Sequence, residues 1–280
     1  MDFQKPVIEL IKTRRSCRTY NGMAIDGIRM QKLQGYIAEI NEISKIKARF
    51  TLTTNQGMDG QKAVKLGTYG IIFGAPSFIV GILDKQENEE TEFGYLFEKI
   101  VLFATDLKLQ TCWLGGTFKQ SDFQQNTSIT DNEYIPIVSP VGTQKDKPRV
   151  LESAMRIMVG ANNRKPWQEL FFAKNASMPL TEQSAGQYAV PLEMVRLGPS
   201  ASNKQPWRII KENNSFHFFL CRTKGYGGTK YDMQKNDLGI AQCHFELAAM
   251  ELGLKGGWQK RTSTNKPKEW EYIATWFSET

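Results

Sequence analysis

Apolar residues recur along the chain with two different periods, and these periods predict the first elements. Residues 6–14 (PVIELIKTR) begin with a proline and place their apolar side chains on one face, which predicts a short amphipathic helix. Residues 24–43 have the same helical spacing. Residues 48–54 (ARFTLTT) and 77–83 (SFIVGIL) are rich in β-branched and aromatic residues between turn formers, which is typical of strands.

Two long apolar segments later in the chain resemble each other. Residues 92–109 are apolar on nearly every face and predict a largely buried helix, and residues 236–254 predict a second one. The two align at an offset of 145 residues, which matches Gly94 with Gly239, Asp106 with Glu251 in charge, and Trp113 with Trp258. Glycines inside both helices would let the two pack closely against each other.

The elements before these helices also repeat. Strands at 48–54 and 77–83 precede the first helix, and the apolar segments WRIIKE and SFHFFLC precede the second. The order helix, strand, strand, helix therefore occurs twice, which indicates an internal duplication, with chance similarity between amphipathic helices as the alternative. We expect a first half at 1–129, a connecting segment at 130–172 that is rich in Pro, Lys and Asn, and a second half at 173–280.

Composition narrows the functional classes. The chain has 280 residues, 40% of them hydrophobic and 23% charged, which is ordinary for a globular protein. The net charge of +7 suits an anionic partner, but the basic residues are scattered singly and form no long block, so we do not expect nucleic acid binding. Four cysteines form no CxxC, and there are two histidines, so we expect neither a metal site nor a disulfide framework.

The sequence shows no targeting or membrane signal. The N-terminus lacks the sustained apolar run of a secretion signal. The longest apolar stretch, residues 69–83, is interrupted by Gly and Pro and is shorter than the roughly 20 residues that a membrane span needs. We therefore expect a soluble, cytoplasmic protein with no membrane partner.

Three short segments carry candidate chemistry. RRSCR (14–18) offers three guanidinium groups and a hydroxyl, which suit a phosphate monoester, although a solvated charged helix end is the alternative. PSASNKQPW (199–207) offers hydroxyls and amides between prolines, which suit the polar edge of a planar heterocycle, with an ordinary turn as the alternative. WLGG (113–116) would let the backbone approach a ligand, or would simply end a helix.

These segments, in this order, resemble the FMN-dependent nitroreductase family, and specifically its single-chain branch, in which one chain mimics the usual homodimer. The resemblance covers most of the chain. It implies an α+β, nitroreductase-like fold with antiparallel or mixed sheets covered by helices. It also implies two pseudo-repeated halves that form an intrachain pseudo-dimer, so the protein could be a monomer.

The resemblance also implies the cofactor site. It assigns the FMN phosphate to Arg14, Ser16 and Arg18, with Arg15 close by and Arg164 returning to the phosphate; the flavin ring and ribityl chain to Pro199, Ser200, Ala201, Ser202 and Asn203, with Gln205 as a supporting neighbour; and the length of the flavin to Leu114, Gly115 and Gly116. RRSCR occurs only in the first half and PSASNKQPW only in the second. We therefore expect one FMN per chain, between its own halves.

The implied activity is the transfer of hydride from NAD(P)H through the flavin to a small-molecule electron acceptor of the nitroaromatic or quinone class. No catalytic side chain is required, and none stands out. The glycine-containing stretch 224–233 could cover the flavin, although an ordinary surface loop is the alternative. Other functions remain open: a flavin enzyme of the same fold with another task, such as reductive dehalogenation or flavin destruction; a flavin-binding redox sensor or carrier without turnover; and a basic nucleic-acid-binding protein. The physiological acceptor and the choice between NADH and NADPH also stay open.

Overall fold

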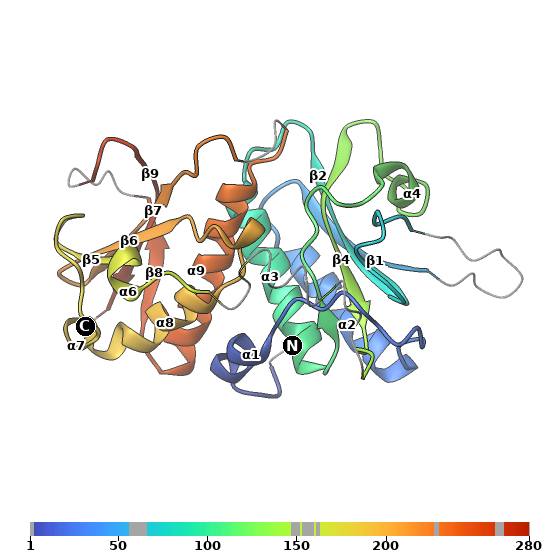
Figure 1. The fold of residues 1–280 in the computed structure, drawn as a ribbon, viewed down its shortest axis with the longest axis horizontal. Coiled ribbons are helices and arrows are strands. Elements are labelled where there is room, and N and C mark those ends of the chain that lie inside the picture. The colour runs from blue at the N-terminus through green and yellow to red at the C-terminus, as the bar shows by residue number, and fades with distance from the viewer. Residues whose placement is uncertain are drawn as a thin grey trace, which may run out of the picture. The chain divides into compact units, whose positions relative to one another are not determined.

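The computed structural model describes residues 3–55, 66–146, 152, 160, 163–226, 230–260 and 266–279. The fold consists of helices and two β-sheets (Figure 1), which confirms the expected α+β class. The chain divides into two compact units. The first unit comprises Met1–Lys5, Thr13–Glu89 and Leu96–Val159, and the second comprises Pro6–Lys12, Glu90–Tyr95 and Gly160–Thr280.

The first unit is built on a four-stranded antiparallel sheet in the order β1-β2-β4-β3. Helix α2 packs on β1, and α2 begins after Asp26, whose carboxylate accepts a hydrogen bond from the Arg29 backbone N–H at 3.0 Å and so caps the helix. The elements are α2 (Gly27–Ile43), β1 (Ala48–Thr54), β2 (Ser77–Asp84), β3 (Gln110–Thr111), α4 (Gln120–Gln124) and β4 (Glu133–Gly142).

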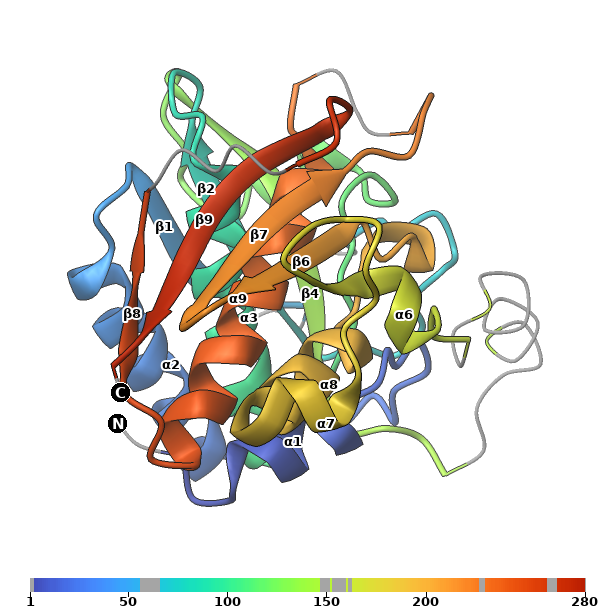
Figure 2. The ribbon, with the colours of Figure 1, turned by 90° about the vertical axis from the view of Figure 1, so that its left-hand side faces the viewer.

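The second unit is built on a five-stranded sheet in the order β5-β6-β7-β9-β8, in which β5 is parallel to β6 and the other pairs are antiparallel. Helices α8 and α9 pack against each other, and α9 lies against β6 and β7 (Figure 2). The elements are α1 (Val7–Thr13), α6 (Trp167–Leu170), β5 (Phe171–Ala173), α7 (Glu182–Ala185), η1 (Gly186–Tyr188), α8 (Ala189–Leu197), η2 (Ala201–Asn203), β6 (Trp207–Glu212), β7 (Ser215–Cys221), α9 (Met233–Glu251), β8 (Gly256–Gln259) and β9 (Trp270–Ser278).

Helix α3 (Glu90–Asp106) contributes its first residues to the second unit and the rest to the first. Its buried side chains include Phe93, Phe97 and Ile100, as the continuous apolar pattern predicts. None of the described helices is long and apolar enough to cross a membrane.

The topology confirms the predicted repeat. The run α2-β1-β2-α3 recurs as α8-β6-β7-α9, and the strand order β1-β2-β4-β3 recurs as β6-β7-β9-β8, with β5 added at one edge. The connecting segment that the sequence placed at 130–172 needs correction in one part, because residues 133–142 form β4, an interior strand of the first sheet. The Pro and polar content of this segment concealed a strand that is buried along most of its length.

The two long helices meet at their matched glycines. A Cβ atom on Gly239 would overlap the carbonyl oxygen of Thr91, and a Cβ on Gly94 would overlap that of Asn236. Thr91 and Asn236 are themselves separated by 145 residues, so each helix offers a glycine to the same position of the other. All four residues belong to the second unit, and the sequence expectation that the glycines allow close packing is confirmed there.

The matched carboxylates at the ends of these helices have a shared role. Asp106, in the first unit, accepts the backbone N–H groups of Gln4 at 2.6 Å and Lys5 at 3.2 Å. Glu251, in the second unit, accepts the N–H groups of Val7 and Ile8, the first residues of α1. Each carboxylate therefore accepts two backbone donors of the N-terminal segment, and in the case of Glu251 these belong to the first turn of α1.

Candidate functional site

Backbone hydrogen bonds hold RRSCR against other segments of the first unit. Ser16 forms a parallel bridge with Thr111 of β3, and the Cys17 N–H donates to the Thr111 carbonyl at 2.9 Å. The Phe73 N–H donates to the Arg18 carbonyl at 2.9 Å. The side chains of the motif therefore project from a backbone that the sheet holds in place.

Three polar side chains of the motif converge on one buried thiol. Arg14, Ser16 and Arg18 are half-buried, whereas Cys112 is fully buried. Burial raises the pKa of the Cys112 thiol, while Arg18, the hydroxyl of Ser16 and Arg14 act in the opposite direction. The two guanidinium groups and the hydroxyl therefore all act on the same buried sulfur of the first unit.

Arg18 carries an unsatisfied donor. Its Nη1 is buried and has no hydrogen-bond partner among the described residues. Its backbone N–H donates at 3.2 Å to the carboxylate of buried Glu152, whose other oxygen also lacks a partner in the described part of the chain. A buried polar group left without a partner costs about 1–3 kcal/mol, so this guanidinium has an unused capacity for an anion oxygen. Arg15, in contrast, is exposed and donates to the Gln144 side chain at 3.2 Å.

The WLGG segment lies beside β4. Leu114 is buried and exchanges both backbone hydrogen bonds with Val138, at 2.9 and 3.0 Å. Gly115 is half-buried and Gly116 is exposed. A Cβ on Gly116 would meet no described protein atom within 4 Å, so protein packing does not account for a glycine at this position and the space beside it is open.

In the second unit, residues 199–205, here called the polar loop, follow α8 and lead to β6. Three of its non-glycine residues have left-handed backbone conformations: Ser202 (φ 47°), Asn203 (φ 54°) and Gln205 (φ 49°). Such conformations cost of the order of 1–3 kcal/mol each and persist only where the surroundings enforce them. They cluster at functional sites more often than elsewhere.

The Asn203 side chain enforces much of this conformation. Its Nδ2 donates to the carbonyls of Gly160 at 2.7 Å and Asn163 at 2.8 Å. Its Oδ1 accepts from Arg164 at 2.5 Å and from Gln205 at 3.1 Å. Both donor hydrogens and both acceptor positions of the amide are therefore used within the second unit.

Gln205 has a similar role. Its Oε1 accepts the Lys165 backbone N–H at 2.8 Å, and its Nε2 donates to the Asn163 carbonyl at 3.2 Å. Its own N–H donates to the Ser200 hydroxyl at 2.9 Å. Gln205 is buried, and these hydrogen bonds hold the polar loop, while its place beside the flavin stays a prediction.

Arg164 lies with the polar loop. Besides Asn203, its guanidinium contacts the Leu197 carbonyl at 3.0 Å. The sequence resemblance implied a return of this arginine to the phosphate, and its assignment to phosphate stays a prediction. Arg164 also connects the end of α8 to Asn203 through these two hydrogen bonds.

Two further side chains hold the polar loop from outside. The Ala201 N–H donates to both carboxylate oxygens of buried Asp237 in α9, at 3.1 Å each. The Tyr226 hydroxyl donates to Ser202 Oγ at 2.9 Å, and the Lys204 ammonium lies 5.4 Å from the centre of the Tyr226 ring. The loop is therefore anchored both to the helix behind it and to the segment that precedes α9.

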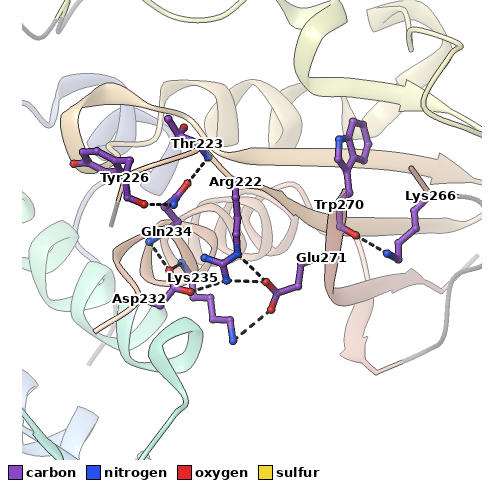
Figure 3. A network of polar contacts seen from close by, with 9 residues as sticks. All are labelled: Arg222, Thr223, Tyr226, Asp232, Gln234, Lys235, Lys266, Trp270 and Glu271. Carbon is purple, nitrogen blue, oxygen red and sulfur yellow. Dashed lines mark hydrogen bonds and ion pairs between the residues drawn. The ribbon is translucent and has the colours of Figure 1, made fainter. Parts of the chain in front are cut away.

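Figure 3 shows how that segment is held. Arg222 forms ion pairs of 2.7 Å with Asp232 and with Glu271 of β9, and Lys235 reaches Glu271 at 3.3 Å. The buried Gln234 accepts the Thr223 N–H and donates to the Tyr226 carbonyl, both at 2.7 Å (Figure 3). The backbone of residues 223–226 is thus fixed to the first turn of α9. The expectation of a flavin cover at 224–233 falls partly on residues 227–229, which lie outside the described residues.

The sequence-predicted residues therefore fall into two groups. Arg14, Arg15, Ser16, Arg18 and Leu114–Gly116 belong to the first unit, and Arg164 and the polar loop belong to the second. Sequence reasoning missed Asp237 and Glu152, and it singled out Tyr226 only as part of the stretch 224–233. No local pattern marks them: Asp237 is one polar residue in a helical run, and its role depends on a partner 36 residues earlier in the chain.

Comparisons with known proteins place this architecture in a family. The family described as "Putative TM nitroreductase" matches residues 6–249. The crystal structure of a putative nitroreductase from Thermotoga maritima matches with a TM-score of 0.59 at 19% identity and covers 99% of this chain and 95% of that one, which indicates a shared fold. No curated protein is a significant match.

Two further solved structures match part of the chain. A nitroreductase family protein from Clostridium difficile has a TM-score of 0.42 at 20% identity and covers 60% of this chain and 96% of that one. A nitroreductase with bound FMN from Bacteroides fragilis has a TM-score of 0.39 at 16% identity and covers 52% and 92%. The family match spans most of the sequence, and the duplicated α+β topology agrees with the Thermotoga structure. This chain belongs to the nitroreductase family.

Proposed function

We propose that this protein is an FMN-dependent oxidoreductase that passes hydride from NAD(P)H to an electron-poor acceptor of the nitroaromatic or quinone class. Family membership supports the reaction type. The observation that carries the cofactor assignment is the buried Nη1 of Arg18, which has no partner among the described residues. It lies in a motif whose residue types suit a phosphate.

The donor set fits the phosphate of FMN. A phosphate monoester carries about −1.5 to −2 charges at neutral pH and offers three strong acceptor oxygens. Arg14 and Arg18 would supply guanidinium donors, Ser16 a hydroxyl, and Arg15 further positive charge close by. The fixed backbone of residues 16–18 keeps these groups in position before any ligand arrives, which lowers the entropy that binding must offset.

The polar loop fits the flavin ring and ribityl chain. Because the amides of Asn203 and Gln205 are used within the protein, the loop would offer a ligand mainly its backbone and the hydroxyls of Ser200 and Ser202. Leu114, Gly115 and Gly116 would lie along the flavin, where the open space beside Gly116 leaves room. FMN itself supplies the redox chemistry, so the protein's residues bind and orient it without a side-chain acid or base.

The sequence carries one copy of each half-site, so we propose one FMN per chain. The first experiment is the visible absorbance spectrum of the purified protein, with released flavin quantified per chain. About one FMN per chain, together with oxidation of NADH or NADPH that depends on a nitroaromatic or quinone, supports the proposal. Two flavins per chain contradict the single site, and none after reconstitution contradicts the cofactor. A yellow protein that oxidises neither nucleotide with any acceptor would be a flavin carrier.

A pair of variants tests the phosphate assignment. Arg14→Ala with Arg18→Ala should abolish FMN retention and leave the far-UV circular dichroism unchanged. Arg29→Ala with Arg49→Ala removes the same charge from other parts of the first unit and should retain FMN. Equal flavin occupancy in both double variants would show that RRSCR does not hold the phosphate.

A further inference from the structure

Asp237 is an ionisable residue on the buried side of α9. It lies in the second turn of α9, only 2% of its surface is exposed, and no ion pair with a described residue reaches it. Burial raises the pKa of this carboxyl, while the hydrogen bond from the Ala201 N–H opposes that change. Burying such a group costs free energy, so its position calls for a specific role.

Its partner indicates that role. Ala201 is the first residue of η2 and stands directly before the left-handed residues Ser202 and Asn203. The N–H groups at the start of a helical turn have no partner within the turn, and both oxygens of Asp237 lie 3.1 Å from this one. Asp237 thus fixes the point at which the polar loop leaves extended geometry and enters its strained conformation.

The first half offers an internal comparison. The offset of 145 residues matches Asp237 with Glu92 of α3, which is half-buried. In that half, only residues 44–47 separate the helix α2 from the strand β1, so there is no counterpart of the polar loop to hold. The repeated helices therefore differ at this position: the carboxyl is fully buried only in the half that contains the polar loop.

We infer that Asp237 is a positioning residue that holds the polar loop in its flavin-binding conformation before the flavin arrives. The inference rests on the proposed function for the identity of the ligand. Its physical content is independent of that ligand: without the Asp237–Ala201 hydrogen bond, the strained segment relaxes, and binding must then supply the free energy of ordering it.

Amide hydrogen exchange of the ligand-free full-length protein tests the first step, because exchange reports local opening. Asp237→Ala should increase the exchange rate of the peptide covering the polar loop about tenfold or more, and should weaken FMN binding by a similar factor. Asp237→Asn keeps an oxygen that can accept the Ala201 N–H and should stay within about threefold of the native protein in both measurements. Asp106→Ala is the matched control, since it removes another buried carboxylate that accepts backbone N–H groups.

A second variant removes the donor instead of the acceptor. Ala201→Pro deletes the N–H at the first position of a helical turn, where proline is tolerated, and the preceding Ser200 (φ −147°, ψ 157°) already has the extended conformation that a following proline requires. It should reproduce the effect of Asp237→Ala even if that variant is too unstable to study. Combining the two should add little, because both break the same contact.

The outcomes separate the inference from the proposed function. Unchanged loop exchange in Asp237→Ala and Ala201→Pro overturns the inference. Faster exchange with unchanged FMN affinity also overturns it, since the loop would then not need to be ordered in advance. If the native protein binds no FMN, the proposed function fails by itself, and the exchange data still decide whether Asp237 positions the loop.

Discussion

The two halves of the chain make the same connection in different ways. In the first half, residues 44–47 lead from α2 directly into β1, and in the second half, residues 198–206 lead from α8 into β6. The short connection is followed by a strand held by Asn41, whose side chain accepts the Phe50 N–H at 2.7 Å and donates to its carbonyl at 2.9 Å. The long connection contains three strained residues and a dense set of side-chain hydrogen bonds.

This difference shows how one architecture can hold two specialised halves. The strand order is the same on both sides, so the connection could lengthen or shorten without changing the sheet. The half with the short connection carries RRSCR, and the half with the long connection carries the polar loop. Each half therefore keeps one part of the proposed cofactor site and has no copy of the other part in its sequence.

The largest expected effect concerns the matched glycines, Gly94 and Gly239, which both halves retain. Gly239→Ala should destabilise the protein by about 3 kcal/mol or more, because the added Cβ meets the Thr91 backbone, which cannot move like a flexible side chain. Gly94→Ala should behave in the same way against Asn236. Urea unfolding measures both.

Gly27→Ala provides the control, because a Cβ there meets nothing within 4 Å and alanine favours helix. If Gly94→Ala and Gly239→Ala are as stable as this control, the reciprocal helix contact does not exist in solution.

An intermediate effect should separate the two connections. Asn203→Ala should cost about 2 kcal/mol, since it removes the four hydrogen bonds of the amide and leaves a left-handed alanine. Asn203→Gly should recover about 1 kcal/mol of this loss, because glycine adopts a positive φ without strain. Thermal unfolding gives the stabilities, and flavin titration gives the affinity.

Asn41→Ala is the matched variant in the first half. It should destabilise the protein by about 1–2 kcal/mol through its two hydrogen bonds to Phe50, without changing FMN affinity. Equal losses of FMN affinity in Asn41→Ala and Asn203→Ala would mean that stability, and not the polar loop, controls binding.

The smallest effect concerns two arginines in matching places. Arg49 and Arg208 are the second residues of β1 and β6, but Arg49 pairs with Glu133 at 2.8 and 2.9 Å, whereas Arg208 donates to the Gln205 and Trp207 carbonyls. The hydrogen bond from Arg49 lowers the pKa of Glu133 to about 2. The stabilisation from this pair is therefore fully present above the ordinary pKa of 4.5 and is lost as the pH falls towards 2.

Arg49→Met should accordingly reduce the free energy of unfolding by about 1 kcal/mol at pH 7, because the pair is partly exposed. It should also make the decrease of this free energy between pH 5 and pH 3 shallower. Arg208→Met should leave that slope unchanged, because no carboxylate of a described residue pairs with it. Urea unfolding at several pH values measures both slopes, and identical slopes for the two variants would contradict the pairing.

The sequence predicted the regular elements better than the connections. Residues 48–54 were predicted as a strand and form β1 with the same bounds, and the helix expected at 92–109 is α3 at 90–106, because apolar periodicity reports directly which faces are buried. β4 was missed because two prolines and neighbouring polar residues resemble a linker, although its buried interior position in the sheet outweighs that local preference.

The candidate site could be predicted only as residue types. RRSCR and the polar loop were recognisable by their resemblance to a family motif, but the polar network of the loop joins residues from Gly160 to Asp237, and no local pattern encodes such distant pairs. That Asn203 and Gln205 serve the loop, and that Asp237 supports it, follows from three-dimensional contacts alone.

The reciprocal glycine contact has a genetic consequence. In a pair of identical subunits related by a two-fold axis, one codon specifies both sides of such a contact, so every substitution is made twice at once. Here Gly94 and Gly239 are separate codons, so a substitution alters one side while the other stays as it was. The contact between the two helices can therefore change in two separate substitutions. After each one, the facing residue on the other helix can change independently to fit the new side chain.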